Sequence, residues 1–478
     1  MPNLSELAST AAGRVPSGVA LVDSAAGQTL TWAQFDAAIN AEAGRLLAAG
    51  MTTGDRVAVR LPTSAAFAVT LLAVMRAGGI AVPTSPQAPV DELQRLLEHS
   101  GARLLVSDRG GLEGVVVGSV LEPPAVTLPG GAGDVPAVDP VGPVGSGEDI
   151  ALLCYTTASL GKARGVMLSH RALLANVAQV AAIEPAPVTA QDRMLVAIPL
   201  FHVYGLGLGL LQCAHTGATA VLAERFDAQD ALADCARHEI TVVLGVPTMY
   251  AELSALPAAE LTAGLASARL LISGAAALRP KVLAAVEQAT GLGVFEGYGL
   301  TETAPALTAT MVTGYPKPGS VGRPIPGVEL RLVDDDPPDD AADDELLADL
   351  EEEEGVTGLV CVRGANLFSG YWPDGVGGPD DDGWFRTSDI GYLDTDGDLH
   401  LVDRANDMII VNGFNVYPHE VEDVIAELPE VAEVAVVGVL DDRTGEAVKA
   451  VVVPAPSAAL SEQQVVQHCA EKLARYMV

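Results

Sequence analysis

Short apolar runs alternate with helix-like segments along most of this chain, and this alternation constrains the fold more than any other feature. Arg56–Leu61 has the composition of a buried strand, Ser64–Arg76 has a helical pattern, and Ile80–Val82 is again apolar. The alternation resumes with Ala151–Tyr155 and Arg193–Ile198, and a helical segment follows each of these runs. Such alternation is typical of parallel strands joined by crossover helices. We therefore expect an α/β fold with two doubly wound sheets.

The chain has 478 residues, more than one hydrophobic core normally holds, so more than one domain is expected. Residues 321–402 contain paired strand-like runs, glycines and turns in place of helices, which predicts a β-rich lobe. Beyond residue 403, strand-like and helix-like runs form a short unit of their own. We expect a large N-terminal domain over residues 1–403, which includes the lobe, and a small α+β C-terminal domain over residues 404–478.

The charge of the chain argues against a nucleic-acid partner. The formal net charge is −35, with 27 lysines and arginines against 62 aspartates and glutamates. Nucleic-acid backbones are bound by surfaces rich in lysine and arginine. Much of the excess lies in Asp334–Glu354, which holds thirteen acidic residues and no basic one. We expect this stretch to be a solvated loop between two strands.

Other features indicate a cytoplasmic protein with no membrane span. The five cysteines are odd in number, and no pair has the spacing of a metal or redox site, so we expect reduced thiols. The N-terminus lacks a basic region followed by an apolar run, so no secretory signal is evident. The longest mostly apolar run, Ala65–Met75, is too short to cross a bilayer. We expect a monomer or a homodimer.

Three segments in the second half of the chain carry side chains that suit a nucleotide. Tyr298-Gly299-Leu300-Thr301-Glu302 offers a ring for stacking, a hydroxyl for phosphate and a carboxylate for Mg²⁺. Thr387-Ser388-Asp389 and Asp403-Arg404 supply an acid and a guanidinium that suit a ribose. Each segment alone is weak, because similar turns occur in many surface loops. Together, and in this order along one chain, they could supply contacts to a base, a phosphate with its metal, and a ribose.

A loop after the strand-like run Ala151–Tyr155 suits a polyphosphate, because glycines, hydroxyls and cations follow one another there. It is not a Walker loop, since Ala163 stands where a magnesium-binding serine or threonine would be required. The candidate phosphate-binding residues are Thr156, Thr157, Ser159, Gly161, Lys162 and Arg164.

These segments, together with the turn Ser273-Gly274-Ala275-Ala276, resemble the acyl-adenylate-forming superfamily of acyl-CoA synthetases, firefly luciferase and peptide-synthetase adenylation domains. The resemblance runs from about Leu30 to Val478 and is closest to CoA ligases for fatty acids or for aryl acids of the 4-coumarate type. It implies ATP, Mg²⁺ and coenzyme A as cofactors or co-substrates, and a small carboxylic acid as the substrate. In the implied reaction, the acid and ATP form an acyl-adenylate, and the thiol of coenzyme A then displaces AMP.

The resemblance also implies roles in the nucleotide site. Adenine would lie between a turn of small residues and the ring of Tyr298, Thr301 would contact the α-phosphate, and Glu302 would hold Mg²⁺. Asp389 would accept hydrogen bonds from the ribose, with Arg404 donating nearby. The implied nucleotide-binding residues outside the phosphate loop are Gly274, Ala275, Ala276, Gly297, Tyr298, Gly299, Thr301, Asp389 and Arg404. The implied catalytic residues are Thr301, Glu302 and His202.

The acyl site is expected to be neutral and apolar. Amino-acid-activating relatives commonly carry Asp where His202 stands, so its absence argues against an amino-acid substrate. Malonate-type relatives place a cation just before the tyrosine, and here that position is Gly297. A fatty or aryl acid is therefore favoured. The implied acyl-binding residues are His202, Tyr204, Gly205, Val246, Gly299 and Ala304.

The chain departs from the superfamily pattern in places. In the phosphate loop, Ala158 and Leu160 replace a glycine and a hydroxyl residue, and Arg164 replaces a lysine, which predicts slower handling of pyrophosphate. Asn406 stands at the implied interdomain hinge, where Asp or Lys is usual. The implied CoA-binding residues are Gly413 and Phe414. Relatives continue into a tail with a Gly-Lys that assists adenylation, so we expect either a truncated sequence or impaired adenylation.

The function favoured by these residues is activation of a medium- or long-chain fatty acid and its transfer to coenzyme A. An aryl-acid CoA ligase is the nearer alternative. A degenerate protein that binds a nucleotide or an acyl group without full turnover also stays open, because of the altered phosphate loop and the absent tail. The same scaffold admits a luciferase-like oxygenase, but no residue here marks one.

Overall fold

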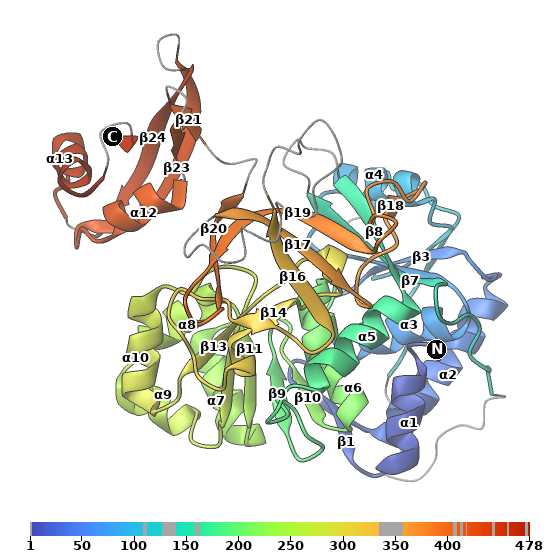
Figure 1. Ribbon diagram of the computed structural model, residues 1–478. Coiled ribbons are helices and arrows are strands. Elements are labelled where there is room, and N and C mark those ends of the chain that lie inside the picture. The colour runs from blue at the N-terminus through green and yellow to red at the C-terminus, as the bar shows by residue number, and fades with distance from the viewer. Residues whose placement is uncertain are drawn as a thin grey trace. The chain divides into compact units, whose positions relative to one another are not determined.

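The computed structural model describes residues 2–108, 112–126, 140–157, 163–333, 357–404, 409–411, 414–416, 418–441, 445–456, 458–473 and 477–478 (Figure 1). The chain divides into two units. The first comprises Met1–Glu329 and Arg363–Phe385, and the second comprises Leu330–Val362 and Arg386–Val478. The acidic stretch Asp334–Glu354 lies outside the described residues.

In the part of the chain that the structure describes, the first set of apolar runs forms a seven-stranded mixed sheet. Its strands are β3 (Arg56–Arg60), β4 (Ile80–Thr84), β5 (Leu104–Ser107), β6 (Ser119–Leu121), β7 (Ile150–Thr157), β8 (Ala163–Ser169) and β18 (Tyr371–Trp372), and its helices are α3 (Ala65–Arg76) and α4 (Val90–Ser100). β3 pairs in parallel with β4 and with β5, and the chain reaches these strands through α3 and α4. The edge strand β18 comes from far along the chain and pairs antiparallel with β8.

The second set of runs forms a sheet with the strand order β15-β14-β13-β12-β11-β9-β10-β1-β2, in which the central pairs are parallel. The strands are β1 (Val19–Asp23), β2 (Gln28–Thr31), β9 (Arg193–Val196), β10 (Thr219–Leu222), β11 (Val242–Gly245), β12 (Leu270–Ser273), β13 (Val294–Tyr298), β14 (Thr308–Ala309) and β15 (Arg323–Pro324). Leu195, Val221, Val243 and Leu271 lie in one buried apolar cluster that joins the strands to their helices. The predicted α/β class is confirmed.

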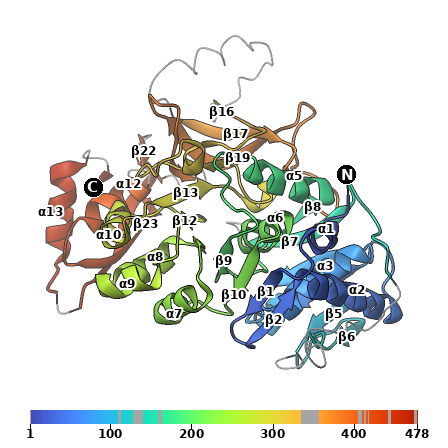
Figure 2. The same cartoon turned by 90° about the horizontal axis from the view of Figure 1, so that it is seen from below.

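The remaining helices of the first unit cover these sheets. They are α1 (Glu6–Arg14), α2 (Trp32–Ala48), α5 (His170–Ala181), α6 (Gln212–Thr216), α7 (Ala228–His238), α8 (Pro247–Ser254), α9 (Ala258–Gly264) and α10 (Pro280–Thr290). Helix α2 contacts both α1 and α3, and Figure 2 shows these three helices side by side. Helices α8, α9 and α10 also contact one another, next to the second sheet.

Local capping explains why several of these helices begin where they do. Thr31 caps α2, because its hydroxyl accepts a hydrogen bond from the backbone N–H of Gln34 at 3.3 Å. The side chain of Gln34 in turn accepts from the N–H of Thr31 at 2.9 Å, which completes a capping box. Ser64 caps α3 by accepting from the N–H of Phe67 at 3.2 Å.

One helical segment differs from a regular α-helix. Residues Gly205–Leu211 form a π-helix, η1, where the sequence pattern suggests an ordinary helix. A Cβ atom on Gly207 would lie 2.6 Å from the Cδ of Pro305, and a Cβ on Gly209 would lie 3.0 Å from Val196. The wider turn therefore packs its glycine backbone closely against its neighbours. Short π-helical turns of this kind are common beside functional sites.

Two further sheets complete the described structure. The β-rich region expected over residues 321–402 contains a sheet in the order β16-β17-β19-β20, formed by β16 (Val328–Val333), β17 (Gly358–Gly364), β19 (Trp384–Leu393) and β20 (Leu399–Arg404). The C-terminal residues form a sheet of β21 (Ile409–Val411), β22 (Phe414–Val416), β23 (Val431–Asp441) and β24 (Gly445–Pro454) with α12 (Pro418–Ala426) and α13 (Glu462–Lys472). Val421, Ile425, Val436 and Val465 belong to its core. The small α+β region is thus confirmed. Among the described residues, no helix is long and apolar enough to cross a membrane.

A buried imidazole holds the N-terminal residues against the start of helix α5. His170, the first residue of α5, is 2% exposed, and its Nδ1 accepts a hydrogen bond from the backbone N–H of Leu4 at 3.0 Å. Burial lowers the pKa of His170 from 6.5 to about 4, although the nearby charges of Asp149 and Glu6 oppose this shift. The imidazole is therefore neutral at neutral pH, which its acceptor role requires.

We predict that His170 makes the free energy of unfolding depend on pH. Because the unfolded chain binds a proton near pH 6.5 and the folded chain near pH 4, its contribution is fully present above pH 6.5 and is lost as the pH falls to 4. The loss amounts to about 3 kcal/mol. Urea unfolding between pH 4 and 7 should show this slope as the difference between the two proteins: as the pH falls, the wild type should lose about 3 kcal/mol more than His170→Gln.

His419→Gln is the matched control, because the side chain of His419 is 67% exposed. This variant should keep the wild-type slope. Identical pH slopes for the wild type and His170→Gln would contradict the prediction.

Candidate functional site

The turn after β12 approaches an aromatic ring closely. Gly274 and Ala275 follow β12, and Ala275 has a φ of 71°. A Cβ atom on Gly274 would lie 2.9 Å from the Cζ of Tyr204, so glycine is needed there. Tyr204 is 7% exposed, and its hydroxyl donates to the carbonyl of Gly245 at 3.1 Å. The structure thus brings the turn expected to hold adenine against a residue expected in the acyl site.

A tight turn after β13 contains the 3₁₀ helix η2 (Thr301–Thr303). A Cβ atom on Gly299 would overlap the carbonyl oxygen of Pro305, so no larger residue fits. The hydroxyl of Thr303 accepts from the N–H of Leu300 at 2.9 Å and donates to the carbonyl of Pro305 at 2.8 Å. These contacts fix the backbone of η2.

A later segment, Asn366–Tyr371, binds this turn, and we call it the clasp. The amide nitrogen of Asn366, which is fully buried, donates to the carbonyl of Thr303 at 2.8 Å and to that of Ala306 at 3.2 Å. The backbone N–H of Phe368 donates to the carbonyl of Glu302 at 2.9 Å. The sequence gives no local sign of the role of Asn366, because a single asparagine in a loop is unremarkable.

The clasp also reaches the side chain of Glu302. The hydroxyl of Tyr371 donates to Oε1 of Glu302 at 2.8 Å, and among the described residues Oε2 accepts no hydrogen bond. Burial raises the pKa of Tyr371 above its usual value, and the negative charge of Glu302 raises it further. The phenol therefore stays protonated and acts as the donor. A Tyr-Trp pair in a chain with only 4% aromatic residues was a signal that sequence reasoning missed.

A second missed residue, Glu296, connects β13 to the turn after β12. It is 5% exposed, and its Oε2 accepts the backbone N–H of Leu278 at 2.9 Å. Its Oε1 is buried without a partner in the described part of the chain. Burial raises the pKa of Glu296 from 4.5 to about 7, and the hydrogen bond from Leu278 opposes this rise. An acid in an otherwise apolar run was the available sequence signal.

A cavity of about 80 Å³ lies between these turns. Eight of the predicted site residues line it, namely His202, Tyr204, Gly274, Ala275, Gly297, Tyr298, Gly299 and Thr301. Residues that the sequence did not indicate also line it, among them Val180, Ile183, Leu208, Met311 and Ile325. Of the residues predicted to contact adenine or the acyl group, four are not among its lining residues, namely Ala276, Gly205, Val246 and Ala304.

The cavity is apolar and uncharged. No lysine, arginine, aspartate or glutamate is among its described lining residues. Burial lowers the pKa of His202 below its usual value, so its imidazole is neutral at neutral pH. The nitrogen Nδ1 of His202 accepts from the backbone N–H of Tyr204 at 3.4 Å. An uncharged ligand group would therefore lose little on entering this space.

The strands on either side of the predicted phosphate loop form a hairpin. Thr156 of β7 lies opposite Arg164 of β8 in the antiparallel register. The guanidinium carbon of Arg164 lies 5.2 Å from the ring centroid of Tyr371. The backbone of Thr157 is described, and its side chain is not. The predicted residues Ser159, Gly161 and Lys162 lie outside the described residues.

In the second unit, β19 and β20 pair Asp389 directly with Arg404. The backbone N–H of Asp389 donates to the hydroxyl of Thr387 at 3.1 Å, and that hydroxyl donates to the carbonyl of Val360 at 2.9 Å. Asp389 is 5% exposed, whereas the side chain of Arg404 is outside the description. The pair predicted for the ribose is thus adjacent in the sheet. Asn406, Gly413 and the side chain of Phe414 also fall outside the described residues.

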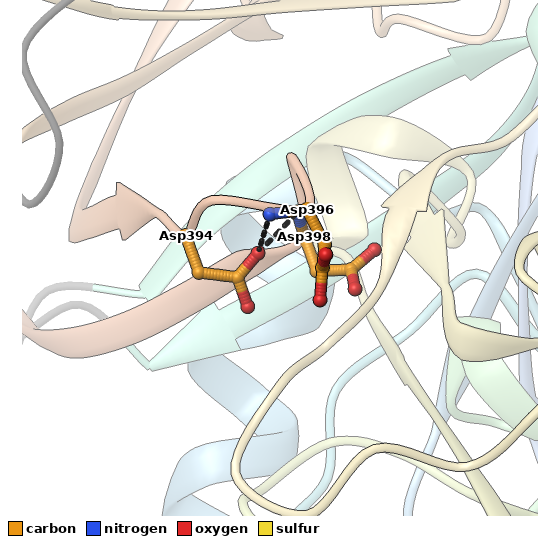
Figure 3. A group of neighbouring side chains, drawn as sticks. All are labelled: Asp394, Asp396 and Asp398. Carbon is orange, nitrogen blue, oxygen red and sulfur yellow. Dashed lines mark hydrogen bonds between the residues drawn. The ribbon is translucent and has the colours of Figure 1, made fainter.

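Three carboxylates gather in the turn between β19 and β20 (Figure 3). Asp394, Asp396 and Asp398 have carboxylate oxygens within 4.8 Å of one another. One oxygen of Asp394 accepts the backbone N–H groups of Asp396 and Asp398, each at 3.0 Å, and the other is 2.7 Å from Nε2 of His400. These bonds close the hairpin turn, and they account for the position of Asp394.

Comparison with known proteins agrees with this arrangement. Residues 8–372 match the model of the AMP-binding enzyme family, and residues 420–478 match that of the AMP-binding enzyme C-terminal domain. The chain is 36% identical over 458 residues to a feruloyl-CoA synthase of an Amycolatopsis species, covering 95% of this chain and 89% of that protein. It is 32% identical over 472 residues to a long-chain-fatty-acid CoA ligase of Escherichia coli O157:H7, covering 90% and 82%.

A solved structure shares the fold. The crystal structure of ATP-bound MatB from Rhodopseudomonas palustris superimposes with a TM-score of 0.86 at 30% identity, covering 100% of this chain and 93% of that one. The family match spans well over half of the chain and includes the cavity, η2 and the clasp. This chain therefore belongs to the AMP-binding enzyme family.

Proposed function

We propose that this protein is an AMP-forming CoA ligase for a carboxylic acid whose tail is uncharged, compact and apolar. The observation that carries the proposal is the uncharged lining of the cavity. A second carboxylate or an amine on the substrate tail would lose its hydration there without gaining a partner. Dicarboxylic acids and amino acids should therefore be poor substrates.

The size of the cavity favours a compact tail over a long chain. Since a water molecule needs at least about 10–15 Å³ of such space, a cavity of about 80 Å³ leaves little room for a long chain. An aryl acid or a medium-chain fatty acid is the candidate substrate. The names of the relatives, a feruloyl-CoA synthase and a long-chain-fatty-acid CoA ligase, support the same reaction class with different tails.

We further propose roles for the residues around the cavity. The ring of Tyr298 stacks on adenine, and Gly274 and Ala275 leave room for the opposite face of the base. The hydroxyl of Thr301 donates to the α-phosphate, and the neutral imidazole of His202 lies beside the acid. The carboxylate oxygen of the acid attacks the α-phosphate and releases pyrophosphate, so the enzyme contributes mainly by orienting the two substrates.

The carboxylate of Glu302 suits Mg²⁺, because Oε2 is a hard oxygen that accepts no hydrogen bond from the described residues. When bound, Mg²⁺ supplies neutralisation of the phosphate charge. Glu302 provides the fixed negative group, and the clasp holds its backbone. We propose that Arg164, together with Lys162, faces the departing pyrophosphate.

The thiol of coenzyme A then attacks the acyl carbon and releases AMP. We propose that residues 404–478 form the domain that moves between the two steps, with Asn406 at the hinge and with Gly413 and Phe414 near the pantetheine arm. The match of residues 420–478 to the family's C-terminal domain supports this division. Asp389 and Arg404 remain our candidates for the ribose.

The proposal is tested by ATP–pyrophosphate exchange with a panel of acids on this chain. Cinnamate and octanoate should support exchange, whereas palmitate, malonate and phenylalanine should support much less. A second assay should detect the thioester when coenzyme A is added. Exchange with none of the acids, together with normal ATP binding, would favour a protein that binds the nucleotide without turnover.

Glu302→Gln should reduce Mg²⁺-dependent exchange about a hundredfold, because it removes the charge that fixes the metal. Stability should change little, since glutamine can still accept the hydrogen bond from Tyr371. Initial rates at several Mg²⁺ concentrations and the melting temperature measure the two effects. Equal losses of activity and of melting temperature would show that the carboxylate is only structural.

Met311→Ala should shift the preference toward acids with longer tails. Met311 is 9% exposed and lines the cavity, so its truncation opens space for further methylene groups. Each additional buried methylene should raise kcat/KM about fourfold relative to the wild type until the space is filled. The control is Met249→Ala, since Met249 is also buried and does not line the cavity. A uniform change for all chain lengths would contradict the assignment.

A further inference from the structure

One side chain connects two functional regions that lie far apart in the sequence. The hydroxyl of Tyr371 donates to Oε1 of Glu302 at 2.8 Å. The guanidinium carbon of Arg164, beside the predicted phosphate loop, lies 5.2 Å from the centroid of the same ring. A single tyrosine therefore contacts both the carboxylate proposed for the metal and a cation proposed for pyrophosphate.

The ring of Tyr371 is held firmly enough to act as a support. Its backbone pairs with Val166 in the β18–β8 ladder, and its N–H donates to the carbonyl of Val376 at 3.1 Å. The ring of Phe368 meets it edge to face, with centroids 5.1 Å apart and an interplanar angle of 69°. A Cβ atom on Gly377 would lie 3.0 Å from the ring, so backbone also packs against it.

We infer that Tyr371 is a positioning residue for adenylation. Its hydroxyl fixes the Glu302 carboxylate so that Oε2 is left for the divalent cation, and its ring holds Arg164 near the phosphate loop. The inference rests on the function proposed above, and it extends that function to a residue in the clasp. Tyr371 touches no reacting atom in this scheme and acts through Glu302 and Arg164.

The two contacts differ in kind and can be separated by substitution. A hydrogen bond to a carboxylate is directional and orients the acceptor. A cation over an aromatic face needs only the ring. Tyr371→Phe removes the first contact and keeps the second, whereas Tyr371→Leu removes both. Tyr315→Phe is the matched control, because Tyr315 is 46% exposed.

For Tyr371→Phe we expect the free Mg²⁺ concentration for half-maximal exchange to rise about tenfold. This factor corresponds to the free energy that one hydrogen bond to a charged group contributes. Affinity for ATP in the presence of EDTA should not change. Mn²⁺ binding to the ATP complex, followed by electron paramagnetic resonance, should weaken by a similar factor and gives a readout that does not depend on turnover. Tyr371→Leu should in addition weaken metal-free ATP binding about threefold, in line with an exposed cation–π contact.

A double-mutant cycle with Glu302→Gln tests whether the effect passes through the carboxylate. If it does, Tyr371→Phe should change the Mg²⁺ dependence much less in the Glu302→Gln background than in the wild type. An equal change in both backgrounds, or an unchanged Mg²⁺ dependence of Tyr371→Phe, would overturn the inference.

If the proposed function itself is wrong, the same experiments give a different result. If Glu302→Gln alone keeps the wild-type Mg²⁺ dependence, then Glu302 is not the metal carboxylate and the proposed function loses that step. Melting temperatures of all variants show whether a loss reflects unfolding. Should Tyr371→Leu fail to fold, Tyr371→Phe still decides the inference, because it removes a single oxygen atom.

Discussion

The hydrogen bonds between the clasp and η2 are the interaction on which the rest of the site depends. The turn after β13 presents the backbone carbonyls of Glu302 and Thr303, and Phe368 and Asn366 of the clasp supply the donors to them. A buried carbonyl without a partner costs on the order of 1–3 kcal/mol, so the turn would rearrange without the clasp. The residues around Glu302 are thus held in place by a segment that is distant in the sequence, and not only by the adjacent strand β13.

Close approach of backbone to backbone and of backbone to rings defines the cavity as much as its side chains do. Gly207 in η1 packs against Pro305, Gly299 lies against the carbonyl of the same proline, and Gly274 lies against Tyr204. Each contact excludes a larger residue. Walls built in this way leave a small space whose volume is then adjusted by flexible side chains such as Met311.

Local patterns were sufficient to predict the α/β fold. Apolar strands, capped helices and glycine-terminated segments leave periodic signals within a few residues, as Thr31 and Ser64 illustrate. The order of the motifs also indicated Tyr298 and Thr301 as candidate site residues, and both line the cavity.

What could not be predicted depends on contacts between distant segments. The two-residue strand β18 has too few residues for a periodic pattern, and its partner β8 is remote in sequence. Asn366 and Tyr371 act only because this pairing brings them beside η2. Val180 lies in the last turn of the amphipathic helix α5 and Ile183 lies just beyond its end, so nothing in the local sequence distinguishes these lining residues from core residues.

The buried carboxyl of Glu296 has a consequence for the behaviour of the protein in acid. Because its pKa is about 7 in the fold and 4.5 otherwise, its contribution to folding declines as the pH rises through that interval. The imidazole that holds the N-terminus has the opposite slope between pH 4 and 6.5. One group takes up its proton on folding while the other releases one, so the two exchanges nearly compensate. The first unit is thereby buffered against mild acidification by two residues that never touch.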